Sequence, residues 1–268
     1  MSAPSTFEYF RPRRIDEARS QLERADSRPL AGGTDLLAQS TSTPPAAVVV
    51  DLQALPLKQI ERSEGRTVIG AMVTLQELVD EFDAFLAEAA RREAPRQVRH
   101  AATVGGTIAA GHAESELVTA LLALDAHVRL AGGEEVPLSA WMPERGEFIT
   151  AVILPEEEGT TGSARVMRTP ADRPIVLVST FVALSEGAVA TLRVAASGVA
   201  ARPVRLFEVE KNLVGKPVDE ALGDIGPLVE GSVNPRGDFR GSAEYRRAMA
   251  GILARRALSE ALGEGAGK

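Results

Sequence analysis

The sequence predicts an α+β protein whose two halves differ in their pattern of strand-like and helix-like segments. Up to about residue 155, short β-branched runs alternate with amphipathic helical stretches, which is typical of mixed α/β structure. Beyond that point, residues 175–184 and 188–196 form two longer β-branched runs separated only by Ser185-Glu186-Gly187, and helical sequence follows. This spacing favours an antiparallel hairpin. We therefore expect a mixed N-terminal half, a boundary near residues 156–172, and a C-terminal domain of antiparallel sheet and helices.

In the first half, residues 14–26 predict a short helix with Ile15, Ala18 and Leu22 on one face. Residues 47–52 form a continuous β-branched run, as expected for a strand covered on both faces. Glycine-containing turns and apolar runs predict further strands, namely a hairpin over 60–71, a strand pair beginning at 126–130, and 152–155.

Helix-start signals place the remaining helices. Thr74 followed by Glu77 has the spacing of a capping box, so we expect a helix to begin there. Ser242 with Glu244 in the next turn predicts the start of the final helix, which continues to about Leu262. Apolar periodicity predicts the others, at 83–94, 116–124, 206–213 and 218–222.

The composition excludes several classes of protein. The 268 residues carry a net charge of −7, which argues against broad neutralisation of nucleic-acid phosphates. No cysteine occurs, so the chain forms no disulfide, uses no catalytic thiolate and ligates no iron–sulfur cluster. The N-terminus has no apolar signal region, and no apolar run reaches the length of a membrane span. We expect a soluble cytoplasmic protein with no membrane span.

Two Gly-Gly segments carry the clearest functional signal. They are Ala31-Gly32-Gly33-Thr34-Asp35-Leu36 and Thr103-Val104-Gly105-Gly106-Thr107. Glycine allows the backbone to approach a ligand closely, and successive amides of such a turn form a concave anion site suited to a diphosphate. Neither segment is a GxGxxG fingerprint or has the lysine of a P-loop, and alone each is more often a tight turn. The pair suggests a dinucleotide held from two sides.

A wider set of stretches resembles a known family. In order along the chain they are 31–36, 50–52, 69–71, 99–106, 121–126, Arg202-Pro203 and 238–247. This succession resembles the FAD-binding medium subunit of the molybdenum hydroxylases, the carbon monoxide and xanthine dehydrogenase family. The likeness covers nearly the whole chain.

The resemblance implies a fold and a cofactor site. It implies a PCMH-type FAD-binding domain of two α/β subdomains, residues 1–55 and 56–165, followed by a C-terminal flavoprotein domain, residues 166–268. In the family the two glycine segments hold the FAD diphosphate between the subdomains. The matching residues are Gly32, Gly33, Thr34, Asp35 and Leu36 in the first segment, and Thr103, Gly105, Gly106 and Thr107 in the second.

The second segment departs from the family pattern. The family usually continues with Asn, an Ala/Ser-Pro pair and an Asp that meets the ribose, whereas this chain continues from Thr107 to Glu116 without Asn or Pro. Glu116 falls at the Asp position, and we expect it to accept hydroxyl hydrogen bonds. A basic residue often lies near the flavin ring in the family. Arg165 is our candidate for it, with Arg168 as an alternative.

Four polar or aromatic positions invite further interpretation. His112, Glu114 and Glu116 alternate and share no helical face, so a metal site is not expected. A solvated loop is the first interpretation, and proton management near the flavin is the second. We interpret Trp141 as a packing residue rather than as a residue that stacks on the flavin. The sequence leaves any catalytic residue unassigned.

The resemblance also implies a function. The chain would be an electron-transfer subunit that receives electrons from two [2Fe–2S] clusters of a small subunit, while a molybdopterin large subunit hydroxylates the substrate. Its FAD would deliver the electrons to an external acceptor. Two alternatives are a free-standing FAD-dependent oxidoreductase on the same scaffold and a binding subunit that has lost FAD.

Overall fold

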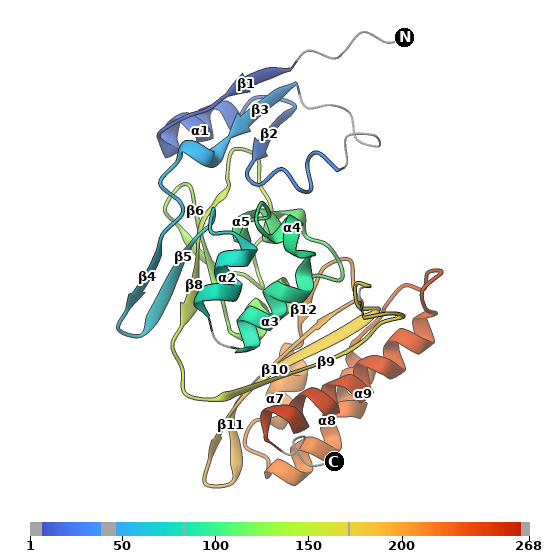
Figure 1. The fold of residues 1–268 in the computed structure, drawn as a ribbon. Helices are drawn as coiled ribbons and strands as arrows, with labels where there is room; N and C mark the ends of the chain where they lie inside the picture. The colour runs from blue at the N-terminus through green and yellow to red at the C-terminus, as the bar shows by residue number, and fades with distance from the viewer. Residues whose placement is uncertain (1–6, 39–46, 83, 171, 264–268) are drawn as a thin grey trace.

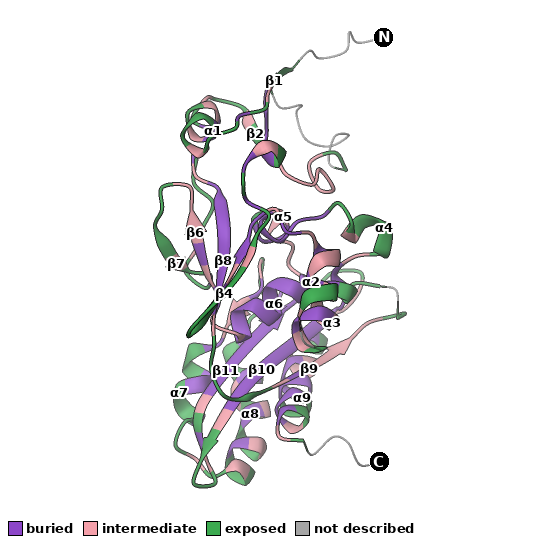
Figure 2. Cartoon of the chain, turned by 60° about the vertical axis from the view of Figure 1, so that its left-hand side comes forward, coloured by how far each residue is buried: buried purple, intermediate pink, exposed green. Residues whose placement is uncertain are grey.

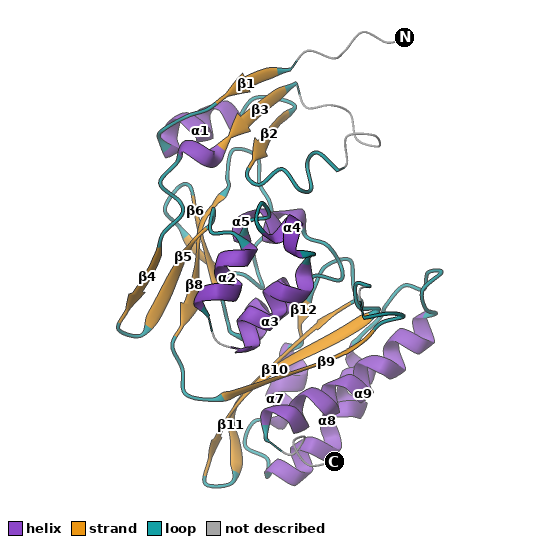
Figure 3. Cartoon of the chain, in the orientation of Figure 1, coloured by secondary structure: helices purple, strands orange, loops and turns teal. Residues whose placement is uncertain are grey.

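A computed structural model describes residues 7–38, 47–82, 84–170 and 172–263. The chain is arranged in three sheet-containing parts (Figure 1), with the first sheet and α1 at one end and the C-terminal sheet with α7–α9 at the other. Helices α2–α6 lie between them. The α+β class predicted from the sequence is confirmed, and helices and strands alternate through the first half as expected (Figure 3).

The first sheet is small and parallel. It contains β1 (Glu8–Phe10), β2 (Ser27–Leu30) and β3 (Val48–Asp51), with β3 in the centre. All four residues of β3 are buried, which confirms the strand covered on both faces. Helix α1 (Ile15–Leu22) packs its buried residues Ala18 and Leu22 against β3 in one hydrophobic cluster.

The second sheet is antiparallel, in the order β4-β5-β8-β6-β7. Its strands are β4 (Ile60–Ser63), β5 (Arg66–Gly70), β6 (His127–Leu130), β7 (Glu135–Pro137) and β8 (Ile149–Pro155). Its helices are α2 (Leu75–Glu81), α3 (Ala84–Glu93), α4 (Arg96–Arg99), α5 (Val104–Ala110) and α6 (Glu116–Ala123). The short 3-10 helix η1 (Leu52–Ala54) leads into this part from β3. The predicted hairpin and strand pair are confirmed.

Helix α6 joins this part to the C-terminal half. Every one of its residues is buried (Figure 2), because α3 covers one side and strands β10 and β11 cover the other. This burial explains why the sequence of α6 is strongly apolar rather than amphipathic.

The C-terminal half contains an antiparallel sheet in the order β12-β11-β10-β9. Its strands are β9 (Thr160–Val166), β10 (Val176–Ser185), β11 (Ala188–Ser197) and β12 (Val204–Arg205), and its helices are α7 (Phe207–Leu213), α8 (Val218–Ser232) and α9 (Ala243–Ala261). The predicted hairpin is β10–β11, and Ser242 caps α9 as predicted. Domain ranges 1–55, 56–165 and 166–268 stay predictions, and β9, most of which falls in the second range, pairs with β10.

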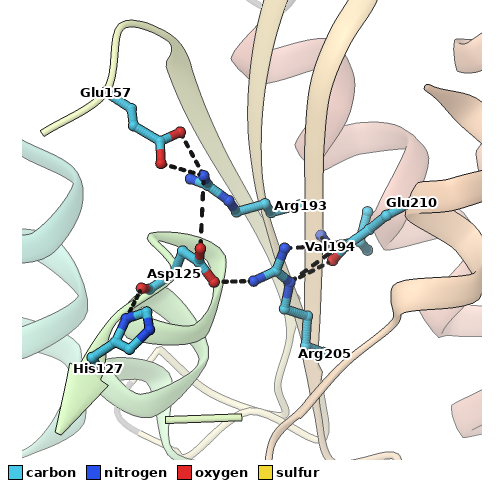
Figure 4. Close-up of polar contacts among 7 residues, drawn as sticks. All are labelled: Asp125, His127, Glu157, Arg193, Val194, Arg205 and Glu210. Carbon is cyan, nitrogen blue, oxygen red and sulfur yellow. Dashed lines mark hydrogen bonds and ion pairs between the residues drawn. The ribbon is translucent and has the colours of Figure 1, made fainter. Parts of the chain in front are cut away.

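A network of charged side chains connects the two halves (Figure 4). Asp125, just after α6, contacts Arg205 of β12 and lies 3.9 Å from Arg193 of β11. Arg193 also binds Glu157 of the connecting segment, while Arg205 binds Glu210 of α7 at 2.9 Å. The network therefore links the second subdomain, the connection and the C-terminal half.

Within the described residues, no helix combines the length and the apolar character that a membrane span requires.

Candidate cofactor-binding site

The two Gly-Gly segments meet at one cavity of about 500 Å³. Every predicted site residue of both segments lines it, from Gly32 to Leu36 on one side and at Thr103, Gly105, Gly106 and Thr107 on the other. The first segment follows β2 of the first sheet, and the second opens α5. The cavity therefore lies between the two parts of the N-terminal half.

The first segment offers backbone donors. Gly33 has a φ of +72°, a left-handed conformation that favours glycine, and its carbonyl accepts from the Leu37 amide at 3.0 Å. Within the described ranges, the amides of Gly32, Gly33 and Thr34 donate to no other group of the chain. Consecutive unpaired amides beside a cavity form the concave donor set that binds phosphate oxygens.

Close packing explains why Gly32 has no side chain. A Cβ at Gly32 would lie 1.8 Å from the carbonyl oxygen of Ala101, in the stretch just before the second segment. A Cβ at Gly105 would lie 2.7 Å from the Cβ of Ala71. The glycines thus allow the first segment, α5 and β5 to approach one another around the cavity.

The second segment is not the turn with exposed amides that the sequence predicts, and that expectation is wrong. Val104 begins α5, and Thr103 is its N-cap, accepting from the Gly106 amide at 3.1 Å. The amides of Val104 and Gly105 donate to the carbonyls of Val73 and Ala71 at 2.9 and 3.0 Å. Because these donors are engaged, the second segment supplies a close-fitting wall rather than an amide cradle.

Glu116 and Arg165, the other two predicted site residues, lie elsewhere. They form an ion pair at 2.5 Å between α6 and β9, and neither lines the cavity. Glu116 is buried, and this burial raises the pKa of its carboxyl against the opposing effect of Arg165. Glu93 does line the cavity, and it accepts from the amide of Leu117, the residue after Glu116, at 2.9 Å.

His112 and Glu114 have separate partners. The Nε2 atom of His112 lies 3.0 Å from Oδ1 of Asp35 in the first segment, and Glu114 binds Arg240 at 2.9 Å. Among the described residues no cluster of three potential metal ligands occurs.

Sequence reasoning missed several walls of the cavity. Trp141 packs against the hydrophobic cluster of the second sheet, as predicted, and it also lines the cavity. Arg28, Glu93 and Arg173 line it as well. Arg173 comes from the turn before β10, so only tertiary structure brings it near the glycine segments.

Two family descriptions match the chain in succession. Residues 5–157 match the "FAD binding domain in molybdopterin dehydrogenase", and residues 164–261 match the "CO dehydrogenase flavoprotein C-terminal domain". The chain belongs to the FAD-binding subunits of the molybdenum hydroxylase family. The resemblance predicted from the sequence is therefore confirmed, and FAD is the cofactor of this family's domain.

The proteins similar to this chain align with almost its whole length. The uncharacterized protein YgfM of Escherichia coli (strain K12) is 32% identical, with 92% of this chain and 93% of YgfM covered. The carbon monoxide dehydrogenase medium chain of Afipia carboxidovorans is 31% identical, with 96% of this chain and 97% of that chain covered. The crystal structure of the Cu,Mo-CO dehydrogenase matches with a TM-score of 0.88 at 30% identity, covering 98% and 100% of the two chains.

The residues of this FAD-binding subunit fit its cofactor. The unpaired amides of Gly32 to Thr34 suit a diphosphate, and the glycines of both segments keep the cavity walls free of side chains where the backbones converge. Apolar side chains that include Leu36, Leu75 and Trp141 complete the lining and suit the planar rings of a dinucleotide.

Proposed function

We propose that this chain holds FAD between residues 31–36 and 103–112 and passes electrons from [2Fe–2S] clusters of a small partner subunit to an external acceptor. The observation that carries the proposal is the shared cavity, with the unpaired amides of Gly32, Gly33 and Thr34 on one wall within the described chain. When bound, FAD supplies the redox chemistry that connects iron–sulfur carriers with the acceptor.

The residues of the chain have distinct parts in this proposal. The amides of Gly32 to Thr34 bind the diphosphate, and the wall formed by Thr103, Gly105, Gly106 and Thr107 fixes the opposite side of the cofactor. Glu93, on the cavity wall, accepts from the Leu117 amide and so fixes the start of α6 beside the cavity. The chain binds and orients the cofactor, and no side chain has to react covalently.

The partners follow from chemistry that this chain lacks. It contains no cysteine, so iron–sulfur clusters must be ligated by another subunit. The relatives support such an assembly, since their names include "medium chain" and "medium subunit". We propose a [2Fe–2S] small subunit and a molybdopterin large subunit as partners, and a cytoplasmic location for the complex.

Purification tests both parts of the proposal, the binding of FAD and the association with partner subunits. The isolated chain should show flavin absorbance close to one equivalent, and a colourless chain that ignores added FAD would contradict the cofactor assignment. Coexpression with the neighbouring reading frames should yield a complex that contains iron and molybdenum. Recovery of an FAD-loaded chain that never associates with such subunits would instead favour the free-standing oxidoreductase.

A further inference from the structure

The carboxylate of Glu93 lies on the cavity wall and is held by the first turn of α6. Its Oε2 atom accepts from the Ser115 hydroxyl and from the Leu117 amide, each at 2.9 Å. Its Oε1 atom has no partner within the described part of the chain, and it is not among the fully buried atoms that lack one. Oε1 is therefore open to the cavity that Glu93 lines.

Glu93 differs in burial from the other acidic residues of this cavity. Among the residues that the structure describes, the other acidic lining residues are Asp35, Glu144 and Glu147, and all three are more exposed than Glu93. Glu93 itself is 9% exposed. Because water competes less at a buried carboxylate, a hydrogen bond from a ligand to Oε1 contributes more to affinity than one made at the exposed rim.

A short series of contacts joins Glu93 to the first glycine segment. The amide of Ser115, whose hydroxyl binds Glu93, donates to the His112 carbonyl at 3.1 Å. The Nε2 atom of His112 lies 3.0 Å from Oδ1 of Asp35, and Asp35 directly follows Thr34, whose amide belongs to the proposed diphosphate cradle. A single loop thus separates Glu93 from the place where the diphosphate would bind.

The chemistry of Oε1 selects among the parts of FAD. A charged carboxylate accepts hydrogen bonds without donating any, and it repels phosphate groups. The parts of FAD that directly adjoin the diphosphate are the ribityl chain on one side and the ribose on the other, and both carry hydroxyl donors. Glu116, which the sequence predicts for the role of hydroxyl acceptor, does not line the cavity, whereas Glu93 does.

We propose that Glu93 is a specificity-determining residue whose Oε1 atom accepts a hydrogen bond from a sugar hydroxyl of FAD, on the ribityl chain or on the ribose. The inference rests on the proposed function, since it requires that this cavity takes FAD. The hydrogen bonds from Ser115 and Leu117 hold the carboxylate in position for this contact. The cavity then favours a ligand that carries hydroxyl groups next to its diphosphate.

Ligand pairs that differ in their hydroxyl groups test the proposal on the flavin-free chain and on Glu93→Gln. The glutamine carbonyl can still accept from Ser115 and Leu117, but an amide nitrogen that only donates replaces the oxygen open to the cavity. Riboflavin and lumiflavin, measured by flavin fluorescence, differ by the hydroxyl-bearing ribityl chain. ADP and 2′,3′-dideoxy-ADP, measured by calorimetry, differ by the ribose hydroxyls.

In one of these pairs, we expect loss of the hydroxyls to weaken binding to the unmodified chain about tenfold, and to weaken binding to Glu93→Gln less than about threefold. The pair that responds identifies the sugar. FAD itself should bind about tenfold more weakly to Glu93→Gln than to the unmodified chain.

Glu88→Gln is the matched control, because Glu88 lies on the same helix α3, binds Arg92 at 2.6 Å and does not line the cavity. This variant should bind every ligand as the unmodified chain does. Hydroxyl loss that weakens binding to Glu93→Gln as much as to the unmodified chain in both pairs would show a purely structural role and overturn the inference. Absence of any hydroxyl effect in the unmodified chain would also overturn it. Failure of the unmodified chain to bind FAD would overturn the proposed function instead.

Discussion

Gly32 lies against the main chain just before α5, at the junction of the two cavity walls. An added Cβ would lie 1.8 Å from the Ala101 carbonyl oxygen, so Gly32→Ala must push the two segments apart. We expect a loss of about 1–3 kcal/mol in unfolding free energy, typical of overpacking, and weaker FAD binding. Gly223→Ala is the control, since no atom lies within 4 Å of a Cβ there and alanine favours the helix. Denaturant melts of both variants measure the difference, and equal stability would contradict the packing argument.

The Glu116–Arg165 pair predicts a pH-dependent loss of stability. Arg165→Met leaves a buried carboxyl without its cation, which costs about 3 kcal/mol in unfolding free energy when the carboxyl is charged. Burial already holds the pKa of Glu116 above its ordinary 4.5, and removal of Arg165 raises this pKa further. The folded state then keeps a proton that the unfolded state releases, so stability falls as pH rises above 4.5 towards the raised value.

Denaturant melts across that pH range check the direction of this change in stability. They compare the single variant Arg165→Met with the double variant Arg165→Met, Glu116→Gln. The single variant should lose stability with rising pH relative to the unmodified chain, and the double variant should not. A single-variant deficit that is the same at every pH would show that lost packing, rather than the carboxyl charge, causes the effect.

At the scale of residues, the sequence predicted the cavity-lining members of both glycine segments, because close backbone approach leaves glycine at fixed positions. It did not predict which polar side chains pair. Asp35 with His112, and Glu116 with Arg165, come from distant parts of the chain, and only the packed structure brings them within contact.

At the scale of elements, the sequence predicted where a helix begins when a side chain caps its first turn. Thr74 and Glu77 form the predicted capping box, with the Thr74 amide donating to Glu77 at 2.8 Å. The length of helix α8 was underestimated because Gly223, Gly226 and Pro227 disfavour a helix. Burial of Ile225 and Val229 stabilises the helix beyond these residues. The helix at Gly105-Gly106 was missed for the same reason, since two glycines obscure an N-cap that Thr103 supplies.

The elements that join the halves should be coupled through Asp125 and Arg205 (Figure 4). A double-mutant cycle with Asp125→Asn and Arg205→Met should give a coupling energy of about 1–3 kcal/mol, because Arg205 is largely buried and the two groups contact directly. The exposed pair of Arg14 and Asp16, 2.7 Å apart, is the control and should show no measurable coupling, because solvent screens it. Similar values for both pairs would contradict a specific role for the network.

At the scale of the whole molecule, three hydrophobic clusters correspond to the three sheets, and α6 packs between the second sheet's helices and the C-terminal strands. The change from alternating short strands and helices to long strands followed by helices predicted the two halves. It could not predict that Arg173 of the C-terminal half would line the cavity, or that Trp141 would do so, because both positions depend on tertiary packing.

Titration of the isolated, flavin-free chain with FAD and with riboflavin tests the central claim most directly. The amides of Gly32 to Thr34 are proposed to hold the diphosphate, which riboflavin lacks, so FAD should bind with one equivalent per chain and at least about a hundredfold more tightly than riboflavin. No FAD binding, or equal affinity for the two flavins, would contradict the account.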